Sequence, residues 1–133
     1  MKNWDIKRIA EEIMRLKNVL IVVNDIEKSK AFYQHLFGLQ VLCDGGETAI
    51  LTEGLVLQDA TVWRSTIEGN IAWNNYASML YFEEPNIEIF IQKLEAYEEF
   101  KGYVNPPCEL DGGQRMLRVF DLDGNLIEVR TPR

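Results

Sequence analysis

The residue best suited to chemistry lies near the C-terminus, in the segment VFDLDGNLIEV at residues 119–129. Glu128 stands there among apolar neighbours. A carboxylate in such a setting is costly unless it pairs with a cation, accepts hydrogen bonds, binds a metal or faces a pocket. Glu128 is therefore a candidate ligand anchor, metal ligand or general base. The alternative is a glutamate on the solvent face of the last strand.

The sequence predicts that Glu128 lies on a strand that follows a tight turn. An Asp-Gly pair just before it is typical of such a reversal. The strand expected at Arg115–Phe120 should lie beside this last strand. Arg115 and Arg118 are therefore candidates for a cation that pairs with Glu128, the alternative for Arg118 being an ordinary surface position.

Two parts of the chain repeat the order of apolar strand, capping residue and amphipathic helix. The first is NVLIVVNDIEKSKAFYQHLFG and the second is MLYFEEPNIEIFIQKLEAYEEF. The offset that takes the capping residue Asp25 to Asn86 also takes Asn18 to Met79. Further strands are expected at Leu39–Cys43, Thr48–Leu51 and Gly54–Asp59 in the first half, and at Gly102–Val104, Arg115–Phe120 and Asn125–Arg130 in the second. Each half thus has the order βαβββ.

The segments NVLIVVNDIEKSKAFYQHLFGLQVL and GGQRMLRVFDLDGNLIEV together resemble the glyoxalase, bleomycin-resistance and extradiol-dioxygenase superfamily, also called the vicinal oxygen chelate superfamily. FYQHLFG and DLDG each depart by one residue from the family form. The resemblance implies an α+β fold, in which two βαβββ modules (18–59 and 77–130) of one domain (18–131) form an incomplete barrel around a cleft. That cleft holds a divalent metal or a ligand in the family. An amphipathic helix is expected before the domain, at residues 1–17.

The resemblance also indicates where a metal would be held. Asn18 and Met79 stand at two positions where the family has stronger ligands such as histidine. Matching the turns of the two modules gives Gln58 and Glu128 as the other two positions, with Leu57 as the alternative to Gln58. Sites for zinc, nickel or iron need imidazoles and two or more anionic ligands, whereas this set carries one negative charge. We therefore predict that the chain binds no metal and needs no cofactor.

The same cleft is expected to offer a mixed apolar and hydrogen-bonding surface. Strand alternation places Met79 and Tyr81 on one face, and Gln58 projects from the first module. Such a surface suits a planar or aromatic small molecule. Between the modules, Trp63 and Trp73 are expected to form a wall of the ligand site or an interface. The alternative for Trp63 is a strand that continues into the core.

Composition limits the choice of partners. The chain has 133 residues, of which 47% are hydrophobic, enough for one domain with a core. A net charge of −7 and a pI near 4.7 argue against nucleic acid and anionic membrane surfaces. No apolar run is long enough to span a membrane, and the two cysteines lack metal-site spacing. We expect free thiols, a cytoplasmic location and, from the aromatic connection, the N-terminal helix and the resemblance, a homodimer.

Three functions remain open from the sequence. The chain is expected to bind a small hydrophobic or planar molecule without a metal, as its resemblance to bleomycin-resistance proteins implies. The first alternative is a metal-dependent lyase, isomerase or dioxygenase of the glyoxalase type. The second is a metal-free enzyme in which Glu128 acts as the catalytic general base beside Arg118 or Tyr81.

Overall fold

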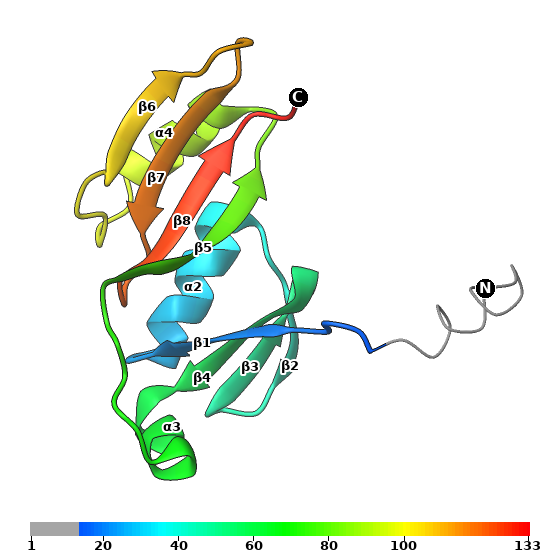
Figure 1. Cartoon of the computed structure of the whole chain (residues 1–133), viewed down its shortest axis with the longest axis vertical. Coiled ribbons are helices and arrows are strands. Elements are labelled where there is room, and N and C mark those ends of the chain that lie inside the picture. The colour runs from blue at the N-terminus through cyan, green and yellow to red at the C-terminus, as the bar shows by residue number, and fades with distance from the viewer. Residues whose placement is uncertain (1–13) are drawn as a thin grey trace, which may run out of the picture.

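The fold consists of two similar modules, each a four-stranded sheet with a helix packed on one face (Figure 1). The computed structural model describes residues 14–133. The first module contains β1 (Val19–Val23), α2 (Ile26–Phe37), β2 (Val41–Asp44), β3 (Thr48–Leu51) and β4 (Leu55–Asp59), with the 3₁₀ turn Thr52–Gly54 before β4. After α3 (Ala60–Ile67), the second module contains β5 (Asn75–Glu83), α4 (Ile87–Glu95), β6 (Asn105–Glu109), β7 (Arg115–Phe120) and β8 (Asn125–Arg130).

The two sheets have the same topology. Their strand orders are β1-β4-β3-β2 and β5-β8-β7-β6. In each sheet the first and last strands of the module pair in parallel, and the remaining neighbours are antiparallel. The predicted α+β fold of two βαβββ modules is confirmed, and within residues 14–133 the sheets stay separate instead of closing into a barrel.

The main helices begin where the sequence supplies a capping side chain. A carboxylate oxygen of Asp25 accepts a hydrogen bond from the backbone N–H of Lys28, and the side chain of Asn86 accepts one from Ile89. Helix α2 ends at Gly38, whose φ of 68° is in the left-handed region that glycine adopts without a Cβ penalty. These caps, which the sequence predicts, fix the ends of the helices relative to the strands.

A single hydrophobic core joins the two modules. It takes alternate residues from the strands, such as Val23 of β1 and both Ile127 and Val129 of β8. Helix α2 lies between the two sheets (Figure 1), and its Phe37 ring has its centroid 4.6 Å from that of Phe82 on β5. The modules are thus packed together through α2 rather than through a shared sheet.

A buried hydrogen bond ties α2 to the turn before β8. The fully buried hydroxyl of Tyr33 donates to Asp121 Oδ2 over 2.6 Å. Asp121 Oδ1 accepts from the backbone N–H groups of Asp123 and Asn125, and Asp123 accepts from the N–H of Asn24 after β1. Burial, together with the charge of Asp121, raises the pKa of Tyr33 well above its usual value, so the hydroxyl stays protonated as the donor.

The same turn requires a glycine. Gly124 has a φ of 82°, and a Cβ at this position would overlap Asn74. The carbonyl of Gly124 accepts a hydrogen bond from the N–H of Asn75 over 3.2 Å. The connection between the modules therefore lies directly against the turn that leads into β8.

The predicted strand at Gly102–Val104 is wrong, because the strand is β6, at Asn105–Glu109. The pair Pro106 and Pro107 made this segment a poor strand candidate, since proline donates no ladder hydrogen bond. The segment is nevertheless a strand because β6 is at the edge of its sheet, where one side needs no partner.

Helix α3 is not predicted by the sequence analysis. Asp59 caps it by accepting hydrogen bonds from the N–H groups of Thr61 and Val62. Trp63 lies on this helix, so the alternative in which Trp63 extends a strand into the core is wrong.

The helix predicted for residues 1–17 falls mainly on residues 1–13, which lie outside the described residues. Residues 14–18 form no helix, and Leu16 is 87% exposed. Cys43 and Cys108 are free thiols, as predicted, and both are exposed. Within residues 14–133 every helix is too short or too polar to cross a membrane.

We expect Tyr33→Phe to lower the free energy of unfolding by about 1.5–3 kcal/mol, because a buried hydrogen bond to a carboxylate is lost. Urea denaturation of both proteins measures the change. Tyr97→Phe is the matched control: its ring also packs on Phe32, but no described residue hydrogen-bonds its hydroxyl. Equal stability losses in the two variants would contradict the prediction.

Candidate functional site

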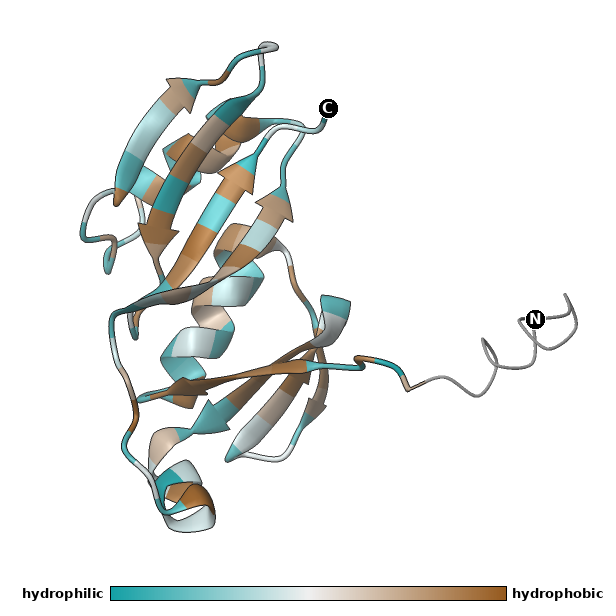
Figure 2. Ribbon diagram, viewed as in Figure 1, coloured by the Kyte–Doolittle hydropathy of each residue, from teal (hydrophilic) through white to brown (hydrophobic). Residues whose placement is uncertain are grey.

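Each sheet has one face against the helices and the core, and one face turned away from them. On the second sheet we call the latter the open face, and Figure 2 shows its hydrophilic residues as bands across otherwise hydrophobic β7 and β8. The open face is formed by alternate residues of β5, β8 and β7, namely Met79, Tyr81, Glu83, Leu126, Glu128, Arg130, Met116, Arg118 and Phe120.

Glu128 lies at the centre of an ion-pair cluster on this face. It is 3% exposed. Its Oε1 accepts hydrogen bonds from Arg118 Nε over 2.8 Å and pairs with Arg118 Nη2 over 2.7 Å, and its Oε2 accepts from Arg130 Nε over 2.7 Å. Arg118 Nη1 donates to Asn105 Oδ1 over 2.9 Å. The predicted pairing of Glu128 with Arg118 is confirmed, and both carboxylate oxygens are occupied.

Arg130 is the site residue that the sequence analysis missed. Strand alternation could have found it, because residues 128 and 130 must point to the same face. Its Cζ lies 5.9 Å from the centroid of the Tyr81 ring, within the range of a cation–π contact. No residue of the described chain accepts a hydrogen bond from its two terminal nitrogens. The Arg130 side chain is thus held by Glu128 at Nε and by the Tyr81 ring, while the N–H donors of its two terminal nitrogens remain available.

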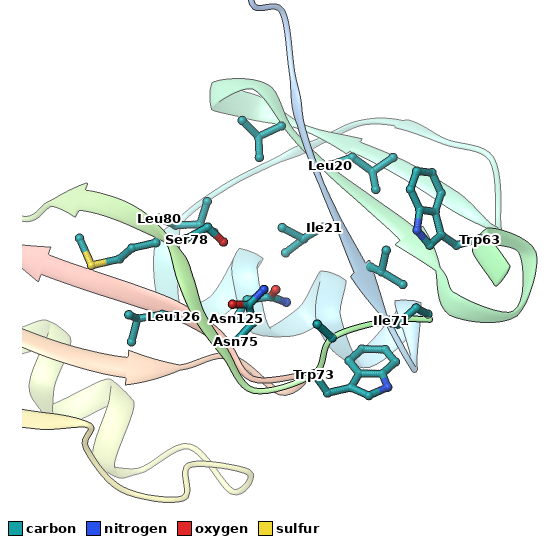
Figure 3. Close-up of a pocket in the computed structure, with 14 residues that line it drawn as sticks. Leu20, Ile21, Trp63, Ile71, Trp73, Asn75, Ser78, Leu80, Asn125 and Leu126 are labelled. Atoms are coloured by element: carbon teal, nitrogen blue, oxygen red, sulfur yellow. The ribbon is translucent and has the colours of Figure 1, made fainter. Parts of the chain in front are cut away.

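A pocket of about 480 Å³ lies where the two modules meet (Figure 3). Figure 3 shows Trp63 beside Leu20, Trp73 on the connection between the modules, and the amides of Asn75 and Asn125 close together. We call it the inter-module pocket, and it is lined by residues 19–22 of β1, Trp63 of α3, residues 71–73, Asn75 and residues 78–80 of β5, and Asn125 and Leu126 of β8.

The inter-module pocket adjoins the open face. Met79 and Leu126 line the pocket, and they pair with each other across β5 and β8. The next residues on the same face are Tyr81 and Glu128, which also pair with each other. Successive residues on one face of a strand are roughly 7 Å apart. An apolar pocket and an ion-pair cluster therefore form one continuous surface.

The first module does not bring its two predicted site residues together. Asn18 precedes β1, whereas Gln58 pairs with Val22, four positions further along. This separates Asn18 and Gln58 by roughly 13 Å along the strands. Gln58 is buried, accepts a hydrogen bond from Thr48 Oγ1 and donates to the carbonyl of Glu47. Its amide is therefore engaged within the sheet.

The strand register gives a different counterpart for Glu128. Tyr81 pairs with Glu128, and Leu20 pairs with Val56. Leu20 and Tyr81 are related by the same offset as the caps of α2 and α4. Val56 rather than Gln58 is therefore the first-module residue that corresponds to Glu128.

Arg115, the other predicted partner of Glu128, lies elsewhere. Its side chain forms an ion pair with Glu88 of α4, and its strand partners are Glu109 and, through the backbone N–H, Thr131. Of the two arginines that the sequence offered, only Arg118 reaches Glu128.

The residues of this surface do not suit a divalent metal. Asn18 and Met79 are weak ligands for hard or borderline ions, and both oxygens of Glu128 are already bound by guanidinium groups. Two positive side chains beside the carboxylate would also repel a further cation, by about 4 kcal/mol for unit charges 4 Å apart near a protein surface. Within residues 14–133 no three His, Cys, Asp or Glu side chains gather as a metal site would need.

Comparison with known proteins agrees with this fold. Residues 16–132 match the family model described as a glyoxalase-like domain. A protein of unknown function from Agrobacterium tumefaciens strain C58 has a similar structure, with 28% identity and a TM-score of 0.76 over 90% of this chain and 95% of that chain. No curated protein matches the chain.

Two further solved structures share the fold at lower identity. One is a glyoxalase/bleomycin resistance protein/dioxygenase family enzyme from Burkholderia phytofirmans PsJN, with 16% identity and a TM-score of 0.70 over 89% of this chain and 98% of that chain. The other is a lactoylglutathione lyase from Agrobacterium tumefaciens, with 19% identity and a TM-score of 0.64 over 90% and 94% of the two chains. At these identities the likeness supports the fold alone.

We expect Glu128→Gln to lower the free energy of unfolding by about 1–3 kcal/mol, because two guanidinium groups lose their shared anion. Chemical denaturation measures the change, and Glu109→Gln on the exposed edge strand β6 is the control. Glu109→Gln should leave the free energy of unfolding nearly unchanged. An equally small change for Glu128→Gln would show that the ion-pair cluster does not stabilise the sheet.

Proposed function

The chain belongs to the glyoxalase-like domain family, and from this premise we propose that it binds a planar, partly apolar small molecule without a metal. The observation that carries the proposal is the inter-module pocket. Its volume of about 480 Å³ lies within the range of small-molecule sites. Trp63 and Trp73 provide flat apolar walls, and the amides of Asn75 and Asn125 provide hydrogen bonds that orient a ligand.

The two catalytic alternatives have weaker support. A metal-dependent lyase, isomerase or dioxygenase needs ligands, but Asn18 and Met79 are poor ones and Glu128 is bound by two arginines. A general base needs an oxygen that points to the substrate. Both oxygens of Glu128 accept hydrogen bonds from guanidinium groups, so the geometry favours an anchoring role over proton transfer.

We also propose that two copies of the chain associate as a homodimer. Apolar side chains are exposed away from the core in both modules, with Leu20 at 37%, Met79 at 42% and Tyr81 at 52%. Strands β1 and β5 are sheet edges, each with one side unpaired. A second copy related by a two-fold axis would cover the equivalent surfaces of both chains at once.

The proposal extends to location. Cys43 and Cys108 are free and exposed, which suits a reducing compartment and supports a cytoplasmic protein.

Binding is tested with 1-naphthamide, a neutral planar probe, by tryptophan fluorescence in the presence of a chelator. We expect saturable quenching, because Trp63 and Trp73 line the pocket. Trp63→Leu should weaken binding by about tenfold, the value of a lost aromatic wall of roughly 1.5 kcal/mol. Tyr76→Leu is the control, since Tyr76 is exposed and lies outside the inter-module pocket.

Two outcomes would refute the binding proposal. One is the absence of saturable binding at millimolar probe. The other is binding that is lost on chelation, which would indicate a metal-dependent site.

The homodimer is tested by sedimentation equilibrium at micromolar concentration. The parent protein should sediment at twice its chain mass of 15.4 kDa, and Leu20→Glu should shift it towards the monomer because a charge is placed on a covered apolar surface. Ile89→Glu is the control, because Ile89 is 52% exposed on helix α4. A parent protein that sediments as a monomer would refute the homodimer.

A further inference from the structure

We propose that the guanidinium group of Arg130 binds the carboxylate of a planar organic anion. This inference rests on the proposed function and specifies the class of ligand. An arginine can donate two parallel N–H groups to the two oxygens of a carboxylate. This bidentate hydrogen bonding fixes the orientation of the carboxylate as well as its position.

Arg130 is held in place, but its outer donors are not used. Its Nε donates to Glu128 Oε2 over 2.7 Å, and its Cζ stands 5.9 Å from the Tyr81 ring centroid. No described residue accepts from its two terminal nitrogens, and 25% of the side chain is exposed. A positioned guanidinium with an accessible edge loses little conformational entropy when it binds a ligand.

Arg118 plays a different part. Its Nε and Nη2 pair with Glu128 Oε1 and its Nη1 donates to Asn105, so each of its nitrogens is engaged. Glu128 is shared by Arg118 and Arg130, so it offsets only one of their two positive charges. The cluster of two guanidinium groups and one carboxylate carries a net charge of about +1 in a chain whose net charge is −7. The local charge therefore favours an anionic group.

One carboxylate could compete for Arg130. Glu83 pairs with Arg130 across β5 and β8 but is exposed, and it forms no ion pair with Arg130. A ligand carboxylate that reaches Arg130 would therefore displace solvent rather than a bound side chain.

The position of Arg130 also defines the rest of the ligand. Tyr81 and Glu128 separate Arg130 from Met79 and Leu126, which line the inter-module pocket. Arg130 is four residues, roughly 13 Å along the strand, from Leu126, but its side chain turns back to Glu128, which is one same-face step or about 7 Å from the row of Met79 and Leu126. A fused aromatic acid has this length, with its rings towards the pocket and its carboxylate towards Arg130.

The test compares 1-naphthoate with 1-naphthamide, which have the same shape and differ in charge, by isothermal titration calorimetry. In the parent protein we expect 1-naphthoate to bind about tenfold or more tightly than 1-naphthamide, because charge-assisted hydrogen bonds are gained. Arg130→Met removes the guanidinium group and its charge but keeps a long unbranched side chain, and it should abolish this preference. Arg115→Met is the matched control, because Arg115 is on the same sheet but pairs with Glu88.

The affinity for 1-naphthamide reports on the pocket independently of the anion. An Arg130→Met protein that still binds 1-naphthamide like the parent, but has lost the preference for 1-naphthoate, supports the inference. Equal affinities of the parent protein for the two probes, or a preference that survives in Arg130→Met, would overturn the inference and leave the proposed function intact. Failure of both probes to bind the parent protein would overturn both.

Discussion

The carboxylate of Asp121 determines how the two modules and the functional strand fit together. It accepts a hydrogen bond from Tyr33 of α2 and from backbone N–H groups of the turn that leads into β8. Because α2 lies between the sheets, this side chain ties the turn before β8 to the first module, in addition to the shared hydrophobic core. The turn in turn sets the start of β8, and a shift of one residue there would move Glu128 from the open face into the core. The ion-pair cluster therefore depends on a hydrogen bond made at the end of the neighbouring strand β7.

On the open face, a buried carboxylate is stabilised by neighbouring guanidinium groups. A nearly buried carboxylate needs a counter-charge, and in the superfamily that this chain resembles a metal can supply it. Here Arg118 and Arg130 supply it instead, and Val56 stands at the first-module position that corresponds to Glu128. The counter-charge of Glu128 is thus supplied by two side chains of the same sheet. Such a cluster is complete without any bound group, whereas a metal site is complete only when it is loaded.

The sequence predicted the parts of the fold that local signals define. Helix α2, strand β7 and strand β8 have the expected bounds, because caps, turns and apolar periodicity are encoded within a few residues. The misses have tertiary causes. Strand β6 contains two prolines and forms because it is an edge, and α3 depends on a cap by Asp59 inside a segment that resembled a loop. In the site, Arg118 followed from strand order. The sequence offered Gln58 or Leu57 as the counterpart of Glu128, and both are wrong, because the strand register that gives Val56 could not be read from two weakly similar halves.

The two modules contribute different chemistry to the surface, one apolar and the other charged. Their sheets share one topology, but the row that holds Leu20 and Val56 in the first module is apolar, whereas the row that holds Tyr81 and Glu128 in the second carries the ion-pair cluster. A ligand with one flat apolar part and one anionic part can satisfy both only in a single orientation. Glu128 and the Tyr81 ring hold Arg130 in position before any ligand arrives, so little side-chain entropy is lost on binding. The glutamate in the segment NLIEV thus positions an arginine, and the outer N–H groups of that arginine are the contact that we propose for the ligand.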